Sequence, residues 1–398
     1  MRSLHDGHMT SQSTPSHSPG TSGPDSGAGL SAPQSALHHS APPCPSTPPV
    51  YDVVIIGGGA AGLSAAVVLG RARRSVIVVD GGEPRNAPAA GVHSYLTRDG
   101  VSPADFVRIG QDEARSYGAV LVDARAVATR RSPDGFTVAL DDGRSVTGRR
   151  LLVATGLIDE LPDLPGLAAR WGRAVLHCPY CHGWEVRDQA IGILGTGAKS
   201  VHQALLFRQW STDVTLFLQG GMLDPAGVLS EEHGPTPAEW EQLAARGIGV
   251  VIGPVESLET HDDALVGVRL ASGELIPLNA LVVAPMFTAR TGFLAGLGIA
   301  PVPHPMGVGE HLDTDETGRV RTDGAVVGGV WAAGNAANLM AQVVVSAAAG
   351  LSVATAINAD LIADDVDTAV AAYRAPFSAD AEARNSVTVL GERRHGLS

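Results

Sequence analysis

The stretch YDVVIIGGGAAGLSAAVVLGRARRSVIVVD, residues 51–80, decides the fold of this chain. Its β-branched run at 53–56 predicts a strand, residues 60–69 predict a helix, and the run at 75–79 predicts a second strand. Glycines in GxGxxG spacing separate the first strand from the helix. This order of strand, glycine turn, helix and strand predicts a Rossmann-like βαβ unit.

The three glycines of the motif have separate tasks in such a unit. Gly57 allows the tight turn, Gly59 lets a pyrophosphate approach the backbone, and Gly62 lets the helix pack closely on the strand. The pyrophosphate would lie at the helix N-terminus, where unpaired N–H groups favour negative charge. Asp80 ends the second strand roughly 20 residues beyond the motif, where a carboxylate can bind ribose hydroxyls. The sequence therefore predicts a dinucleotide site.

A second unit of the same kind occupies DQAIGILGTGAKSVHQALLFRQWSTDVTLFLQGG, residues 188–221. Gly195 and Gly197 match the first two glycines of the motif, and Ser200 stands at the place of the third. The small serine still allows the helix to lie close to the strand. We therefore expect a second dinucleotide-binding fold.

The ligand of this second fold stays open. A site for NADPH needs a cation near the end of the second strand, and one for NADH usually has an acid there. This strand ends in Gln219-Gly220-Gly221 and offers neither charge. Lys199 in the turn could reach a phosphate, although a lysine at such a place is more often solvated. The sequence leaves NADPH or NADH open as a second cofactor.

The segment HCPYCHGWE, residues 177–185, contains two cysteines in CxxC spacing. A structural zinc site needs four ligands, and the chain has no second cluster to complete one, so no metal site is expected. A structural staple around so short a loop would stabilise the fold little. Two thiols at this spacing can close a disulfide ring on a helical turn, where the helix start favours the thiolate. We therefore predict that Cys178 and Cys181 form a redox pair.

Composition excludes several classes of protein. The 398-residue chain has a formal net charge of −13, which disfavours binding to nucleic acid or to an anionic membrane. Three cysteines do not make an extracellular disulfide framework, and no uninterrupted apolar run approaches the ~20 residues of a membrane span. The expected compartment is a reducing cytoplasm. Residues 1–50, rich in Ser, Pro and Gly, are predicted to be disordered, with Cys44 as an incidental thiol.

Two later segments resemble recurring pieces of flavoproteins with two dinucleotide domains. They are RRLLVATGLIDELPDLPG (149–166) and GGVWAAGNAANLMAQVVVSAAAGLSVATAINADL (328–361). With the first glycine motif, CPYCHG and the second glycine fold, they resemble the low-molecular-weight thioredoxin reductases over residues 51–375. The resemblance implies an α/β fold of two Rossmann-like, three-layer ββα domains, with the second inserted into the first. The implied boundaries are 51–166 and 290–376 for FAD, 167–289 for the CxxC domain, and a tail at 377–398.

The resemblance also implies the residues of the site and an assembly as a homodimer. Cys181 would contact the isoalloxazine, and Cys178 would exchange with the substrate. Gly195 and Gly197 would belong to the second nucleotide turn. The residues implied to bind FAD are Gly57, Gly59, Gly62, Asp80, Ala154, Thr155, Gly156, Gly334, Asn335 and Gln342.

Three departures from ordinary thioredoxin reductases bear on the reaction. His182 follows the second cysteine where those enzymes have an acid, Gln219-Gly220-Gly221 replaces a His-Arg-Arg cluster, and Gly334-Asn335 replaces Gly-Asp. CPYCHGWE more closely resembles the FAD-dependent dithiol oxidases that close disulfides in natural products such as gliotoxin and holomycin. In that branch dioxygen reoxidises the flavin. An imidazole with an ordinary pKa of ~6.5 can take a proton from a thiol near neutral pH, so we predict His182 as the general base.

Three functions follow as hypotheses. The first is an FAD enzyme that oxidises a dithiol through Cys178–Cys181 and passes the electrons to dioxygen. The second is an NAD(P)H-dependent thioredoxin-disulfide reductase, and the third is a non-catalytic flavin redox sensor. The substrate is a small dithiol or disulfide, or a thioredoxin-like protein, and the sequence does not choose between them. His177 receives no role.

Overall fold

The computed structural model describes residues 49–197, 199–223, 229–230, 234–375, 378–379, 382–384 and 386. Cys44 and nearly all of the segment predicted to be disordered lie outside these residues, as does most of the tail at 377–398. The sequence predicted that Val50 belongs to the disordered segment. In the structure Val50 is instead the first residue of a strand.

The first sheet is built from both ends of the chain. Its strands are β1 (Val50–Ile56), β2 (Val76–Asp80), β3 (Val120–Asp123), β4 (Ala126–Ser132), β5 (Gly135–Leu140), β6 (Ser145–Val153), β19 (Arg319–Thr322) and β20 (Ala325–Ala332). The order is β19-β20-β6-β1-β2-β3, and β5 pairs with both β4 and β6. β20, β6, β1, β2 and β3 are parallel, whereas β19 and the β4–β5 hairpin run antiparallel to their neighbours.

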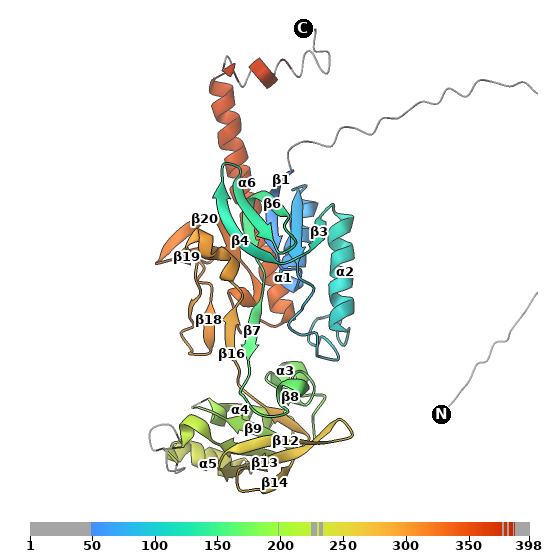
Figure 1. Ribbon diagram of the computed structural model, residues 1–398, viewed down its shortest axis with the longest axis vertical. Coiled ribbons are helices and arrows are strands. Elements are labelled where there is room, and N and C mark those ends of the chain that lie inside the picture. The colour runs from blue at the N-terminus through green and yellow to red at the C-terminus, as the bar shows by residue number, and fades with distance from the viewer. Residues whose placement is uncertain are drawn as a thin grey trace, which may run out of the picture. The chain divides into compact units, whose positions relative to one another are not determined.

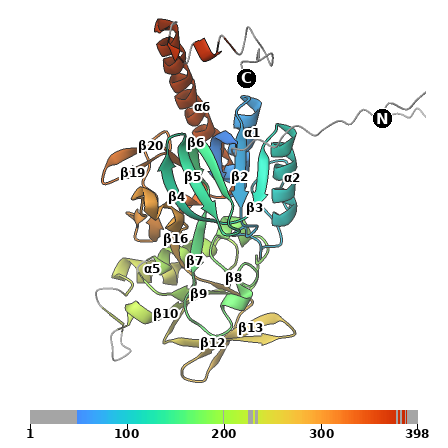
Figure 2. The same ribbon diagram turned by 45° about the horizontal axis from the view of Figure 1, so that its top comes forward.

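The first domain has three layers, and this sheet is the middle one (Figures 1 and 2). The helices α1 (Ala60–Arg71) and α6 (Val343–Arg374) pack on one face, where Val53 and Ile55 lie in the core. The β4–β5 hairpin contributes Phe136 to the other face, where Val54 and Ile56 are buried. Because β1 is covered on both sides, its apolar run is continuous and not alternating. α2 (Pro103–Ser116) packs beside α1 and β3.

The strands of the second sheet come from the part of the chain that separates the two halves of the first sheet. It has the order β11-β10-β9-β15-β8, with all neighbours parallel, and its strands are β8 (Val175–Leu176), β9 (Ile191–Gly195), β10 (Val214–Leu218), β11 (Gly249–Ile252) and β15 (Ala280–Val282). The helices α4 (Ser200–Phe207) and α5 (Pro237–Ala245) share one apolar cluster with it. A meander of β12 (Val255–His261), β13 (Ala264–Leu270) and β14 (Leu275–Pro277) shares the other. The predicted fold of two Rossmann-like ββα domains, one inserted into the other, is therefore confirmed.

Two paired strands carry the chain into the second domain and back. β7 (Leu157–Glu160) leaves the first domain, β16 (Met286–Ala289) returns to it, and the two pair antiparallel (Figure 1). The short strands β17 (Val302–Pro303) and β18 (Gly309–His311) extend this sheet beyond β16. Since these strands are continuous with both domains, the boundaries at 166 and 289 stay a prediction.

The helix α6 lies close to the glycine turn. A side chain at Gly350 would collide with the backbone of Ala61, so the two helices touch through their backbones. By length and composition alone α6 is the one helix among the described residues that could cross a membrane. Its first half supplies Val353, Ala354 and Ile357 to the core of the FAD domain. A core helix passes the same test, so this finding gives no argument for a membrane.

Candidate active site

The first glycine turn has the geometry that its sequence predicted. Gly57 has a φ of +108°, which favours glycine, and a side chain at Gly62 would collide with the carbonyl oxygen of Gly57. In contrast, a Cβ added to Gly59 would meet no protein atom within 4 Å. The space beside Gly59 is therefore open to a ligand, as a pyrophosphate site requires. Asp80 Oδ1 accepts a hydrogen bond from the Gly58 N–H at 2.9 Å, which fixes the carboxylate at this turn.

A single cavity of about 1470 Å³ extends from this turn to the cysteine pair. Ordinary ligand pockets measure roughly 300–1,000 Å³, so this cavity has room for a large cofactor together with part of a substrate. It contains nearly every residue that the sequence predicted to bind FAD or to react: Gly57, Gly59, Asp80, Ala154, Thr155, Gly156, Gly334, Asn335, Gln342, Cys178, Cys181 and His182. Gly62 serves the packing of α1, and Gly195 and Gly197 lie elsewhere, in the turn between β9 and α4.

Backbone turns form the wall of the cavity between the two halves of the FAD domain. Gly156 has a φ of +68°, and Gly334 has a φ of +70°. The Thr155 hydroxyl donates to the carbonyl oxygen of Arg290 at 2.8 Å. This bond ties the end of the first half of the domain to the start of the second.

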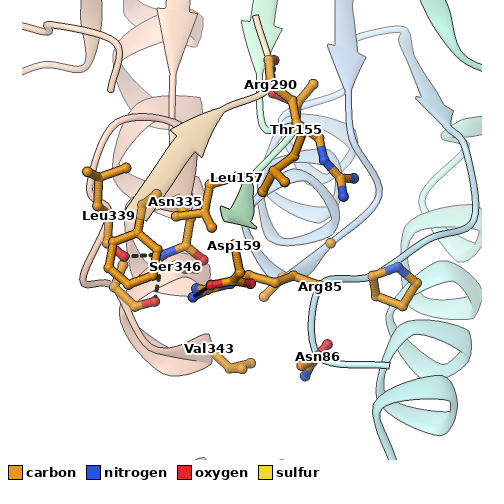
Figure 3. A pocket seen from close by; sticks show the side chains of 18 of the residues that line it. Arg85, Asn86, Thr155, Leu157, Asp159, Arg290, Asn335, Leu339, Val343 and Ser346 are labelled. Atoms are coloured by element: carbon orange, nitrogen blue, oxygen red, sulfur yellow. Dashed lines mark hydrogen bonds and ion pairs between the residues drawn. The ribbon is translucent and has the colours of Figure 1, made fainter. Parts of the chain in front are cut away.

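Asn335 lines the cavity, but its amide nitrogen is fully engaged by its own loop. Nδ2 donates to the carbonyl oxygens of Asn338, Leu339 and Ala341 at 3.0, 3.3 and 2.8 Å. Figure 3 shows Asn335 beside Leu339. An aspartate could not make these bonds because its ionised carboxylate only accepts. The Gly-Asn departure therefore has a structural reason, which the sequence did not reveal.

The cysteine pair is a disulfide beside the first turn of α3 (Pro179–His182). Cys178 is the N-cap of this short helix, and the two Cα atoms are 5.3 Å apart. Gln342, which precedes α6 in the FAD domain, places Nε2 4.0 Å from Cys178 Sγ. The structure thus brings Cys178 against a residue of the FAD domain, whereas the sequence expected Cys181 to face the flavin; which sulfur does so stays a prediction. No three His, Cys, Asp or Glu side chains gather as metal ligands in the described part of the chain.

The two histidines that flank the cysteines are both partly buried. Burial lowers the pKa of His182, a nearby Glu185 raises it, and His93 lowers it. Burial also lowers the pKa of His177, and its Nδ1 lies 3.1 Å from the carbonyl oxygen of Val283. Since a carbonyl only accepts, this Nδ1 carries the hydrogen. Burial therefore favours the uncharged form of both imidazoles, which can accept a proton.

Sequence reasoning missed an ion pair in the wall of the same cavity. Arg85 donates from Nε and Nη2 to the two carboxylate oxygens of Asp159 at 2.7 and 2.6 Å (Figure 3). The guanidinium also lies over the ring of Phe287, 5.2 Å from its centre, and His177 meets the same ring edge to face. Asp159 lies on β7 and Phe287 on β16, so this cluster fixes the loop after β2 to both connecting strands. The only signal in the sequence was the pair of acids that ends the short strand LIDE, of which Asp159 makes the ion pair.

The second glycine turn is occupied by its own chain. The Ser200 hydroxyl accepts hydrogen bonds from the N–H groups of Thr196 and Gly197 at 3.1 and 3.3 Å. These are the donors that a pyrophosphate would need. A Cβ at Gly197 would still meet no atom within 4 Å among the described residues, so the surface of the turn is open although its donors are taken.

In the described part of this second domain, neither the end of the second strand nor the lysine of the turn offers a free cation to the phosphates of NADPH. Gln219 Oε1 accepts from the Val255 N–H at 2.6 Å, so this side chain points to the start of β12. Lys199 Nζ donates to the carbonyl oxygen of Met306 in the first domain. The lysine that could have bound a phosphate is therefore engaged in a contact between the domains.

These residues fit FAD. The open space at Gly59, the fixed Asp80 carboxylate and the glycine turns at 156 and 334 accommodate a dinucleotide in the first domain, and the disulfide lies in the same cavity. The fold and the site together define a flavin-dependent oxidoreductase that acts on sulfur groups.

Comparison with known proteins agrees with this class. The profile of the pyridine nucleotide-disulphide oxidoreductases matches residues 51–350. The chain is 31% identical to the thioredoxin reductase sirT of Leptosphaeria maculans, over 81% of this chain and 97% of the relative. It is 32% identical to the thioredoxin reductase tcpT of Claviceps purpurea, over 65% of this chain and 81% of the relative. The crystal structure of HlmI is similar with a TM-score of 0.72 and 42% identity, covering 82% of this chain and 97% of HlmI.

The chain belongs to the pyridine nucleotide-disulphide oxidoreductase family, as a thioredoxin reductase-like flavoprotein that uses FAD. The resemblance drawn from the sequence is thereby confirmed, together with the enzyme class.

Proposed function

We propose that this enzyme oxidises a small dithiol to a disulfide, through Cys178–Cys181 and FAD, with dioxygen as the final electron acceptor. The observation that carries the proposal is the second glycine turn, whose N–H donors are taken by Ser200. An enzyme that draws its electrons from NADPH needs those donors and a nearby cation. Here Lys199, the lysine of that turn, is bonded to the carbonyl oxygen of Met306.

His182 is the proposed general base. Its burial favours the neutral imidazole, which takes the proton of a substrate thiol as the S–H bond breaks. The thiolate then attacks Cys178, the Cys178–Cys181 bond breaks, and a mixed disulfide forms. The second substrate thiol resolves it, which leaves the substrate as a disulfide and the enzyme cysteines as thiols. FAD supplies the two-electron acceptor that restores the enzyme disulfide, and dioxygen is reduced to peroxide.

A second candidate is an NAD(P)H-dependent thioredoxin-disulfide reductase. The complete parallel sheet of the second domain supports it, and relatives such as sirT bear the name thioredoxin reductase. In that function the electrons would run from the nicotinamide to the disulfide. The glycine turn would then have to open its bonds to Ser200 before the cofactor could bind.

Anaerobic reduction of the flavin separates the two candidates. We expect a reduced dithiol such as dithiothreitol to bleach the flavin quickly, NADPH to bleach it slowly, and oxygen to restore the colour with release of peroxide. Cys178→Ser and Cys181→Ser should each abolish bleaching by the dithiol, because a lone thiol cannot complete the exchange. Fast stoichiometric bleaching by NADPH, with turnover on a thioredoxin, would replace the proposal with the second candidate.

We also propose a homodimer, as the family resemblance implies. In the second half of α6, Leu361 is buried in the core, but Ile362, Val366, Val370 and Tyr373 are exposed at 38–86%. Their spacing of three and four residues places them along one side of the helix. An apolar stripe of this kind is suited to the same stripe of a second copy.

A further inference from the structure

An exposed aromatic side chain lies at the reactive end of the large cavity. Tyr180 stands between the two cysteines on α3 and lines the same cavity as both of them. It is 59% exposed, although a large aromatic side chain gains much free energy from burial. No hydrogen bond within the described part of the chain holds its hydroxyl. Folding of the chain therefore leaves this ring available to a ligand.

Trp210 supports the ring of Tyr180. The two ring centres are 5.6 Å apart, and the ring planes are at 85°. In an edge-to-face pair of this kind the indole covers at most one face of the tyrosine ring. Trp210 is itself fixed, since its ring packs against the buried Phe207 and a Cβ at Gly183 would come within 2.9 Å of the indole. Tyr180 is thus a supported ring with at least one face free of the tryptophan.

A second exposed aromatic residue near the cysteines differs from Tyr180. Trp184 is 66% exposed, but it lies outside the set of described residues that line the cavity. The guanidinium of Arg187 lies over its ring, 4.1 Å from the centre. A protein such as a thioredoxin would meet the outer surface, where the chain's own arginine already occupies one face of the indole. A small substrate would enter the cavity and meet the ring of Tyr180.

We propose that Tyr180 is a specificity-determining residue, whose free ring face stacks on a flat ring of the substrate while the substrate thiols reach the disulfide. This inference rests on the proposed function and adds what the substrate carries besides its two thiols. Stacking on an aromatic face rewards a ligand with a flat face of its own. Because Tyr180 directly precedes Cys181, a ligand stacked on this ring is held beside the disulfide. An open-chain dithiol lacks this contact.

The test compares two dithiols that both carry alkyl thiols. Benzene-1,2-dimethanethiol has an aromatic ring, and dithiothreitol has none. With the oxidised holoenzyme, the dependence of the flavin bleaching rate on dithiol concentration gives a Kd and a limiting rate for each. In Tyr180→Ala the preference for the ring-bearing dithiol, expressed as the ratio of the two Kd values, should fall about three- to tenfold. Tyr180→Phe should restore the preference, because the ring is kept.

Trp184→Ala is the matched control, because it removes an equally exposed aromatic side chain outside the cavity, and it should keep the preference. An unchanged Kd ratio in Tyr180→Ala would overturn the inference. So would an equal loss in Trp184→Ala, or a Tyr180→Ala variant that loses only limiting rate. The first of these results would mean that the ring does not contact the substrate, and the last that its role is structural.

A second measurement separates this inference from the proposed function. The bis(methyl thioether) of benzene-1,2-dimethanethiol cannot exchange with a disulfide, so its binding by calorimetric titration does not depend on the reaction. It should bind more weakly to Tyr180→Ala than to the wild type. If dithiols fail to bleach the wild-type flavin, the proposed function is wrong, and this titration still decides whether Tyr180 binds the ring. Equal binding to both proteins would overturn the inference.

Discussion

The Ser200 hydroxyl accepts the backbone N–H of Thr196 at 3.1 Å, in the turn where a nicotinamide dinucleotide would place its pyrophosphate. In a glycine-rich turn of this type the small third residue normally serves only close packing. Here the hydroxyl supplies an internal acceptor in place of a phosphate oxygen. The chain thus retains the fold of a dinucleotide domain while its own side chain occupies the donors.

Removing this hydroxyl should improve the binding of NADPH. Ser200→Ala frees two N–H groups and keeps a good helix former, and each restored hydrogen bond contributes about 0.5–1.5 kcal/mol. We expect the Kd for NADPH, measured by quenching of flavin or protein fluorescence, to fall several-fold. Ser352→Ala, which removes an exposed hydroxyl on α6, should leave the Kd unchanged. An unaltered Kd in Ser200→Ala would show that the turn does not limit binding.

Two glycines of the first turn should respond differently to the same substitution. Gly59→Val places a side chain in space that no protein atom occupies, so the protein should fold, lack yellow colour and contain almost no FAD. Gly62→Val collides with the Gly57 carbonyl, so it should fail to fold or lose much of its stability. Circular dichroism and the flavin absorbance check both. Full flavin content in folded Gly59→Val would refute the site.

Local patterns predicted the parts of this molecule that depend on neighbours in sequence. The run of residues 53–56, the glycine turn and the CxxC ring each lie within a few residues, and the structure has all three in the predicted form. The Arg85–Asp159 pair joins residues far apart in the chain, and no periodicity marks it. Ser200 and Asn335 were noted as departures from a pattern, but the acceptor of each bond depends on how the loop closes.

The loop after Asn335 should be stable with an amide at this position and less stable with a carboxylate. Asn335→Asp replaces a donor to three carbonyl oxygens by an acceptor, so the free energy of unfolding in urea should fall by about 1–3 kcal/mol. Asn358→Asp is the matched control, because Asn358 Oδ1 accepts from Arg74 Nε at 2.8 Å and a carboxylate strengthens that bond. The control should lose no stability. Equal losses in both variants would contradict the assignment.

The apolar stripe on α6 should be needed for the dimer. Val366→Asp puts a charge at the centre of the stripe, which is costly to bury at an interface, and we expect a monomer by light scattering at concentrations where the wild type is a dimer. Val127→Asp makes the same change at an equally exposed residue of β4 and should leave the mass unchanged. A wild type that is monomeric at every concentration would end the proposal.

The buried histidines should make the fold sensitive to mild acid. His177 and His182 both have a pKa lowered by burial, whereas in the unfolded chain each titrates near ~6.5. The unfolded state therefore binds more protons below pH 6.5, so stability is full above this pH and is lost as the pH falls toward the lowered pKa values. Between pH 7 and pH 5 the wild type should therefore lose stability in urea unfolding. His177→Gln/His182→Gln should lose less over this interval, and the exposed control His261→Gln should lose as much as the wild type. An equal loss in the double variant would mean that these two histidines already bind protons in the folded protein at pH 5.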